Sequence, residues 1–175
     1  MNRSNSLFKF FIKIDHFENR NFINMLKEEL TIIIKELLPN AVIEEAGEWL
    51  NFFLEATEFK QAALQLRNFN QMPFDFLFCL TCVDWKTHFT MVYHLRSKKT
   101  NDNIVIKVKL NRETPEIDTV SDIWRTAEFH EREVFDLFGI VFLQHPDLRR
   151  LFLTDDWVGY PLRKDYDDPI NMIKL

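Results

Sequence analysis

The sequence predicts an α+β fold, in which helices form one layer against a mixed β-sheet, and three observations support it. Two segments repeat apolar residues at three- and four-residue steps, which is the period of an amphipathic helix. Five other segments combine apolar runs or alternation with flanking turn residues, as strands do. The order is helix, two strands, helix and three strands (α-β-β-α-β-β-β), which favours two packed layers. A further helix and an extended C-terminal arm are expected to follow.

The first helix and two strands occupy the N-terminal part of the chain. Residues 21–38 present one apolar helical face, and Pro39 ends the helix. The next two segments, 41–46 and 48–54, flank Gly47, so we expect two short strands around a tight turn.

The second helix and three longer strands come next. Thr57 is expected to cap the helix. The continuous apolar run of residues 75–85 is typical of a strand that is covered on both faces. Residues 89–96 and 104–110 alternate apolar and polar side chains, and the polar loop 97–103 joins them as a hairpin.

The C-terminal third differs in character from the rest. Ser121 is expected to cap a helix over residues 122–138, which Gly139 ends in a left-handed conformation. Residues 140–175 show neither the helical nor the strand period for long, yet they are too rich in large apolar side chains for a disordered tail. Such an arm needs a covering surface, either its own domain or a partner protein. We therefore expect residues 1–120 to form an α+β domain and residues 121–175 to form a helix followed by an arm. The two parts together are expected to form one structural unit.

Composition argues against several classes of protein. Three glycines are too few and too scattered for a Walker phosphate loop or a Rossmann turn. Two cysteines and five histidines without ligand spacing disfavour zinc or iron–sulfur centres, and so few cysteines fit a reducing, cytosolic compartment. A formal net charge of −5 disfavours nucleic-acid binding, and no apolar run reaches the length of a membrane span.

Two short motifs suggest chemistry, but their context argues against it. Cys79 and Cys82 have the spacing of a redox pair, yet they lie in a predicted strand rather than at a helix start, so we expect buried thiols. His130 and Glu131 resemble the start of a metalloprotease helix, but the second histidine that motif requires is replaced by Val134.

The charged run on the predicted C-terminal helix allows three interpretations. Glu131, Glu133 and Asp136 with His130 could act as general acid and base. Arg132 lies among them at the four-residue spacing of ion pairs on a helix, which favours a solvated helix face. The same face could instead contact a partner. On chemistry alone we rank these as solvated, then interface, then catalytic.

Two basic pairs, Arg149-Arg150 and Arg163-Lys164, occur in the arm. Nucleic-acid binding is disfavoured there because acidic residues alternate with them and cancel the local field. Alternating charges spaced by large apolar residues suit a specific protein contact better. The acidic residues are Asp147, Asp155, Asp156 and Asp165.

A longer pattern in this region resembles a known family. Residues 131–140 read EREVFDLFGI, and residues 145–151 read HPDLRRL. The segments 155–157 and 159–166 continue with DDW and GYPLRKDY. Over residues 124–166 the chain is similar to the C-type, or 30-kDa-type, subunit of respiratory complex I, which is NADH-quinone oxidoreductase. It departs from the family at Phe129, Gln144 and Asp167, where tryptophan, glycine and proline are common.

The resemblance implies a non-catalytic subunit of the peripheral arm of a proton-translocating NADH:quinone oxidoreductase. Such a protein would hold the electron-transfer and quinone-pocket subunits in register, chiefly by contact with the larger quinone-pocket subunit. FMN, iron–sulfur clusters and quinone are expected in those partners, with no cofactor, metal or active site in this chain. Membrane association is expected only through the complex, on the cytoplasmic face of the bacterial inner membrane.

The resemblance also implies an interface with other subunits. Acidic side chains of the helix would pair with partner cations, basic pairs of the arm with partner carboxylates, and four apolar residues would serve as anchors. The expected interface residues are Glu131, Arg132, Glu133, Asp136, His145, Asp147, Leu148, Arg149, Arg150, Trp157, Leu162, Arg163, Lys164, Asp165 and Tyr166, with the anchors Leu148, Trp157, Leu162 and Tyr166.

Three alternatives stay open. The chain could be the equivalent subunit of a related complex, such as a plastid or cyanobacterial NAD(P)H-quinone oxidoreductase or a membrane-bound hydrogenase. It could be a standalone hydrolase that uses His130, Glu131 and Glu133. It could also be a free-standing adaptor outside respiration.

Overall fold

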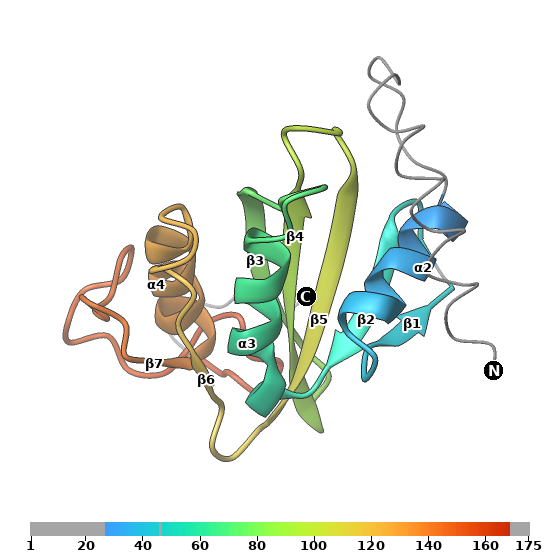
Figure 1. Ribbon diagram of the computed structural model, residues 1–175. Coiled ribbons are helices and arrows are strands. Elements are labelled where there is room, and N and C mark those ends of the chain that lie inside the picture. Colours follow the sequence, from blue (N-terminus) through green and yellow to red (C-terminus); the bar gives the residue numbers. More distant parts are fainter. Residues whose placement is uncertain (1–26, 46, 169–175) are drawn as a thin grey trace, which may run out of the picture.

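The computed structural model describes residues 27–45 and 47–168, in which helices pack on one face of a mixed sheet (Figure 1). The first seven described elements follow the predicted order of helix, two strands, helix and three strands. The three helices are α2 (Lys27–Leu37), α3 (Ala56–Arg67) and α4 (Ala127–Phe138). The predicted α+β class is confirmed. Residues 21–26 of the predicted first helix lie outside the described residues.

The main sheet has five strands in the order β1-β2-β5-β4-β3. Only β2 and β5 run parallel, with Phe52 opposite Ile106, and the remaining neighbours are antiparallel. The hairpin that joins β4 to β5 is therefore present as predicted. The bounds are β1 Val42–Glu44, β2 Leu50–Leu54, β3 Phe76–Asp84, β4 His88–Arg96 and β5 Asn103–Asn111.

The core lies between the sheet and the helices. The apolar residues of the predicted alternation in β4 and β5 are buried, but Thr90, Val92 and Val105, which lie between them, are buried as well. Phe59 of α3 packs on the ring of Tyr93 with centroids 4.4 Å apart. Strand β3 differs from the prediction, because Thr81 is exposed and Val83 is 36% exposed on its outer face. The helices of the described residues pack on one face of the sheet (Figure 1), so a continuous apolar run does not imply burial on both faces.

Both predicted N-terminal helix caps, Thr57 and Ser121, are wrong. Helix α3 begins one residue before Thr57, after Glu55. Helix α4 begins at Ala127 rather than at residue 122, and turns occupy residues 121–126. Tertiary contacts explain the late start, because the Trp124 indole donates to the Phe74 carbonyl at 2.9 Å and holds these turns against the sheet.

A second, two-stranded sheet was not predicted. It pairs β6 (Glu116–Asp118) with β7 (Val141–Leu143) in parallel and so connects the chain before α4 with the chain after it. Strands of three residues are too short to show a period in the sequence. Gln144, which follows β7, has a φ of +62°. This left-handed conformation favours glycine, the residue that the family resemblance implies is common at this position.

Candidate functional site

Helix α4 and the residues after it join an ordered helix to a segment without long regular elements. The helix ends at Gly139, whose φ is +72°, and the Gly139 N–H donates to the carbonyl of Phe135 at 2.9 Å. A Cβ atom at Gly139 would lie 2.5 Å from the ring of Tyr160. The glycine therefore ends the helix as predicted and lets the arm, defined from here on as residues 144–168, pack on the helix end.

Asp136 anchors the arm to α4. Its side chain is fully buried, and Oδ2 accepts the backbone N–H groups of Leu151, Phe152 and Leu153 at 3.0, 2.7 and 3.0 Å. Its Oδ1 lies 2.8 Å from Nη1 of Arg150. Burial by itself raises the pKa of Asp136, but these hydrogen bonds outweigh it and the pKa is lowered. An ionised carboxylate thus fixes three consecutive residues of the arm.

Two arginines satisfy carbonyl groups of the arm. Arg150 donates to the carbonyls of Trp157 at 3.0 Å and Gly159 at 3.3 Å. Arg132 of α4 donates to the carbonyls of Arg149 at 3.3 Å and Arg150 at 3.1 Å. Hydrogen bonds from charged donors are stronger than neutral ones. They hold in place a backbone that has few sheet or helix bonds.

Arg163 closes the C-terminal end of α4. Its Nε donates to the carbonyl of Phe138 at 2.6 Å, where a cation also complements the helix dipole. The guanidinium lies 4.5 Å from the ring centroid of Tyr160 and 5.2 Å from that of Phe89. Arg150 and Arg163 are predicted to pair with partner carboxylates, and in this structure both guanidinium groups make contacts within the chain.

A second anchor at the end of β3 holds the far part of the arm. Asp84 is 3% exposed and accepts the backbone N–H groups of Lys86 at 2.6 Å and Lys164 at 2.8 Å. Arg112 pairs with Asp84 and places its Nη2 2.6 Å from Asp165. Burial raises the pKa of Asp84, but its hydrogen bonds, led by the one from Arg112, lower it overall. Sequence reasoning missed this anchor, although a carboxylate within an apolar run was a signal.

Glu131 also faces inward. Its carboxylate is fully buried, accepts the Thr119 hydroxyl, and accepts the N–H of Val120 at 2.8 Å. The buried Nε2 of His145 lies 3.7 Å from the same carboxylate. The first-ranked interpretation, a solvated face, is therefore wrong for Glu131, Arg132 and Asp136. Direct pairing of Glu131 and Asp136 with partner cations is also wrong, because their partners are internal.

The other predicted interface residues divide by exposure. Glu133, Asp147, Arg149, Lys164 and Asp165 offer charged groups at the surface, and Asp147 pairs with Arg149 at 3.0 Å. Of the predicted anchors, Leu162 is exposed, whereas the remaining three are half-buried: Leu148, Trp157 and Tyr166.

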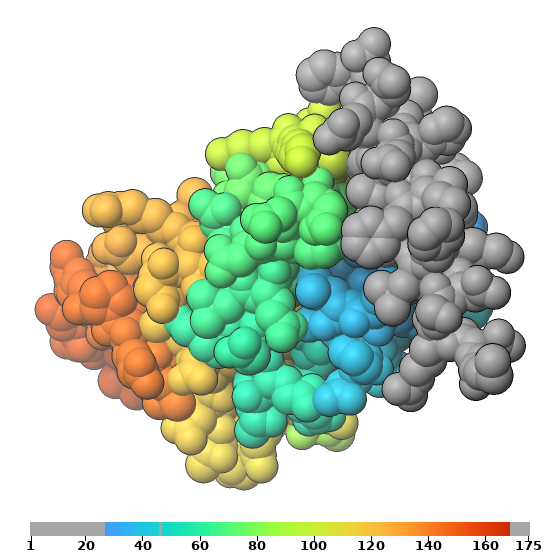
Figure 2. All heavy atoms as spheres, in the orientation of Figure 1, coloured from blue at the N-terminus to red at the C-terminus, as the bar shows by residue number. Residues whose placement is uncertain are grey.

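Several exposed apolar side chains belong to α4, β7 and the arm, and these segments lie at one side of the molecule (Figure 2). Val158 is 86% exposed and Phe152 is 65% exposed. Sequence reasoning did not single these out as anchors, since composition shows that a segment is apolar but not which side chains face outward. We call these residues the exposed apolar set: Phe129, Val141, Leu143, Phe152, Val158 and Leu162.

The groups considered for catalysis do not converge. His130 lies 3.9 Å from Glu133, whereas Glu131 points away toward Thr119. Within residues 27–45 and 47–168, no group of three or more potential metal ligands is found. In the same ranges, no helix is long and apolar enough to cross a membrane.

The two cysteines are free thiols. Cys82 is buried, and burial raises its pKa to about 12. Cys79 is half-buried rather than fully buried as predicted, and burial raises its pKa as well. Both shifts disfavour the reactive thiolate.

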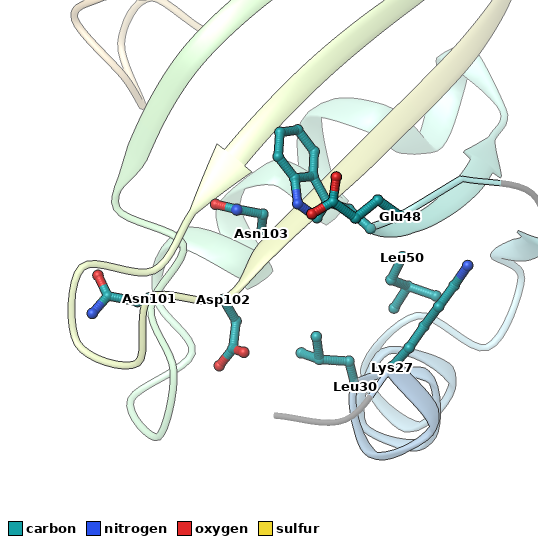
Figure 3. A pocket seen from close by; sticks show the side chains of 8 residues that line it. Lys27, Leu30, Glu48, Leu50, Asn101, Asp102 and Asn103 are labelled. Carbon is teal, nitrogen blue, oxygen red and sulfur yellow. The ribbon is translucent and has the colours of Figure 1, made fainter. Parts of the chain in front are cut away.

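One pocket lies far from α4, where α2 meets β2 and the β4–β5 hairpin (Figure 3). Lys27, Glu48 and Asp102 contribute charge to it, and Leu30 and Leu50 contribute apolar surface. Lys27 donates from Nζ to the carbonyls of Glu45 and Gly47 at 3.2 and 3.0 Å. None of the residues predicted for the interface lines this pocket.

Comparison with known protein families matches residues 52–170 to the family described as "Respiratory-chain NADH dehydrogenase, 30 Kd subunit". The match covers most of the sheet, α4 and the arm. It therefore includes both the Asp136 and the Asp84 anchors.

Relatives with full names agree with this match. The C/D-type NADH-quinone oxidoreductase subunit of Phocaeicola vulgatus is 51% identical over 124 residues, which cover 70% of this chain and 24% of that protein. The C-type subunit of Chloroherpeton thalassium is 40% identical over 139 residues, covering 77% of this chain and 58% of the relative. That of Chlorobium phaeobacteroides is 35% identical over 140 residues, covering 77% and 84%. The chain thus spans about a quarter of the length of the C/D-type relatives it matches.

Two solved structures share the fold. A chain of the membrane-bound sulfane sulfur reductase, an archaeal respiratory membrane complex, superposes with a TM-score of 0.70 at 28% identity and covers 80% of this chain and 85% of its own. A trypsin-resistant fragment (1–134) of Nqo5 gives a TM-score of 0.57 at 31% identity and covers 70% of this chain and all of its own.

Proposed function

Because the chain belongs to the family of the respiratory-chain NADH dehydrogenase 30 Kd subunit, we propose that it is a non-catalytic peripheral subunit of a proton-translocating NADH:quinone oxidoreductase. The match across residues 52–170 carries this proposal. The chain holds electron-transfer and quinone-pocket subunits in register, and FMN, iron–sulfur clusters and quinone belong to those partners. It attaches to the cytoplasmic face of the bacterial inner membrane only through the complex.

The proposed principal partner is the larger, D-type subunit that forms the quinone pocket. Support comes from the relatives of C/D type, of which this chain matches about a quarter. Their name assigns both subunits to one polypeptide, which keeps the two parts at high effective concentration. Two separate chains need an interface to achieve the same proximity.

The exposed apolar set is the proposed centre of that interface. Large exposed apolar side chains mark protein contacts, and such contacts owe most of their affinity to a few central residues. Phe152 and Val158 are the most exposed of the set. The surface charges of Glu133, Arg149 and Lys164 form a polar rim that selects the partner.

The buried charges act indirectly in this proposal. Asp136 and Arg150 fix the backbone at residues 151–153, and Phe152 projects outward from that backbone. A side chain whose backbone is fixed before binding loses less conformational entropy when it is buried. The charged signature thus pre-organises the contact rather than forming it.

The test is affinity purification of a tagged chain from detergent-solubilised membranes of a cell that expresses the whole complex. We expect the wild type to retain flavin- and iron–sulfur-containing proteins, and Val158→Asp to lose them at unchanged thermal stability. Val42→Asp is the matched control, because Val42 is 65% exposed on β1 and lies outside the proposed interface. Equal recovery with both variants would overturn the proposed surface. Absence of respiratory proteins from the wild-type eluate would favour a free-standing adaptor.

The equivalent subunit of a related membrane complex is the second candidate. The TM-score of 0.70 to a chain of the archaeal sulfane sulfur reductase favours it. The same eluate distinguishes the two, because an NADH:quinone oxidoreductase carries flavin and oxidises NADH. An eluate that contains iron–sulfur proteins but has no NADH oxidation would select the second candidate.

A further inference from the structure

A buried acid lies where α4, the end of β6 and the chain after β7 meet. Glu131 is fully buried and accepts hydrogen bonds from the Thr119 hydroxyl and the Val120 N–H. The Nε2 atom of His145, whose side chain is also fully buried, lies 3.7 Å from Oε2 of Glu131. Neither the proposed docking role nor any catalytic role uses this pair.

The hydrogen bonds of His145 define which nitrogen carries the proton. Its Nδ1 accepts the N–H of Asp147 at 3.0 Å, so Nδ1 has no proton. Its Nε2 then carries the proton and donates to the carbonyl of Glu128 at 3.0 Å. The imidazole is therefore neutral in this arrangement.

Other charged and titratable groups around Glu131 come from three elements. Lys60 of α3 donates to the Thr119 carbonyl and pairs with Asp122, so much of its charge is already compensated. From β4, Tyr93 faces the same region, and its fully buried hydroxyl has no hydrogen-bond partner in the described part of the chain. On the side of the arm, Asp147 lies 3.9 Å from Arg132. No cation contacts the Glu131 carboxylate directly in this described cluster.

We propose that Glu131 and His145 form a proton-linked latch, in which protonated Glu131 favours docking of residues 141–147 on α4 and ionised Glu131 favours their release. The ionised form is a buried anion without a charged partner, which is unfavourable. Release admits water to the carboxylate, which solvates the anion. Val141 and Leu143 of the exposed apolar set lie on the same segment, so the latch controls how they are presented.

The direction of the pH effect follows from the two states of Glu131. Burial raises its pKa to about 7 in the docked state, against 4.5 as the ordinary value. Opening therefore releases a proton between these two pH values. The opening equilibrium constant rises by up to about tenfold per pH unit in that range and levels off above it.

Hydrogen exchange of the full-length chain tests the latch. Base-catalysed exchange alone accelerates about tenfold per pH unit, so a proton-releasing opening gives up to about a hundredfold per unit at the Val120 and Asp147 amides. Glu131→Gln keeps the shape of the side chain but cannot ionise, and we expect the ordinary tenfold dependence there. Glu133→Gln is the matched control and keeps the steep dependence, because the Glu133 side chain is 45% exposed on the same helix.

Two results would overturn the proposal. One is the same exchange slope in wild type and Glu131→Gln. The other is titration of the Glu131 carboxyl carbon near pH 4.5, the ordinary value, measured by its ¹³C chemical shift. The shift measurement needs no substitution, so the proposal stays testable even if a variant folds poorly.

Discussion

The Asp136 carboxylate accepts four hydrogen bonds, and Asp136→Asn tests how much they stabilise the fold. The asparagine side chain would place its own N–H group against backbone N–H donors of the arm. It would also leave Arg150 without its counter-ion. We expect a loss of about 3 kcal/mol in the free energy of unfolding, as is usual when one partner of a buried pair is removed. Urea denaturation measures it. Asp155→Asn, on an exposed arm residue, should leave the midpoint unchanged, and a similar loss there would contradict this account.

Glu131 makes stability depend on pH in the opposite sense from Asp136. Its pKa is raised in the fold, so the native state binds a proton more tightly than the unfolded chain. The associated stabilisation is fully present below pH 4.5 and is lost as the pH rises through about 7, a change of roughly 3 kcal/mol. Urea titrations at about pH 4 and about pH 8, on either side of this range, should show the loss in wild type and in Glu133→Gln. Glu131→Gln should lack it, and an identical loss in that variant would contradict the assignment.

The sequence identified the charged residues that matter, but not the groups that they contact. Glu131, Asp136 and Arg150 were all predicted as functional, yet as groups that face a partner. Their actual partners lie 7 to 17 positions away along the chain, across a turn or in the arm. Helical spacing reports only neighbours three and four positions apart. Contacts made by a coil segment that folds back onto a helix leave no such period.

At the scale of elements, the end of α4 depends on Gly139. Gly139→Ala places a Cβ atom 2.5 Å from the Tyr160 ring and 2.7 Å from Arg163, at a φ of +72°. We expect a loss above about 2 kcal/mol, from left-handed strain plus displacement of the arm. Gly47→Ala is a suitable comparison, since it has φ +95° but meets mainly the far end of the Asn51 side chain. Thermal unfolding of both variants measures the difference, and equal losses would show that the arm does not depend on this close approach.

Periodic elements were predictable and the short ones were not. The alternation in β4 and β5 identified residues that are buried, although Thr90, Val92 and Val105 at the alternate positions are buried too. The start of α4 was misplaced because the Trp124 and Thr126 side chains bond to the carbonyls of Phe74 and Leu77. Such tertiary bonds override local helix propensity. Strands β6 and β7 pair only because α4 brings their two segments together.

At the scale of the whole molecule, two carboxylate anchors attach one arm to two elements of the fold, α4 and β3. Asp136 holds residues 150–153 on α4, and Asp84 holds Lys164 at the end of β3. Tyr160 and Arg163 lie between these points and cover the end of the helix. The arm therefore presents Phe152, Val158 and Leu162 from a backbone that is fixed at both ends. A docking surface can be built on irregular chain in this way, without a core of its own.

The Asp84 anchor can be isolated by a double-mutant cycle with Arg112. Arg112→Gln leaves a nearly buried carboxylate without its cation, and Asp84→Asn leaves the cation with Asp165 alone. Each single change should cost about 3 kcal/mol, and the double variant should cost less than the sum by about 1–3 kcal/mol, because it strands no charge. Denaturation of the four proteins gives this coupling, and hydrogen exchange at the Lys164 amide shows whether the arm is released with it. Additive costs, or an unchanged Lys164 amide in all four proteins, would mean that Asp84 stabilises the sheet locally and that Asp136 alone holds the arm.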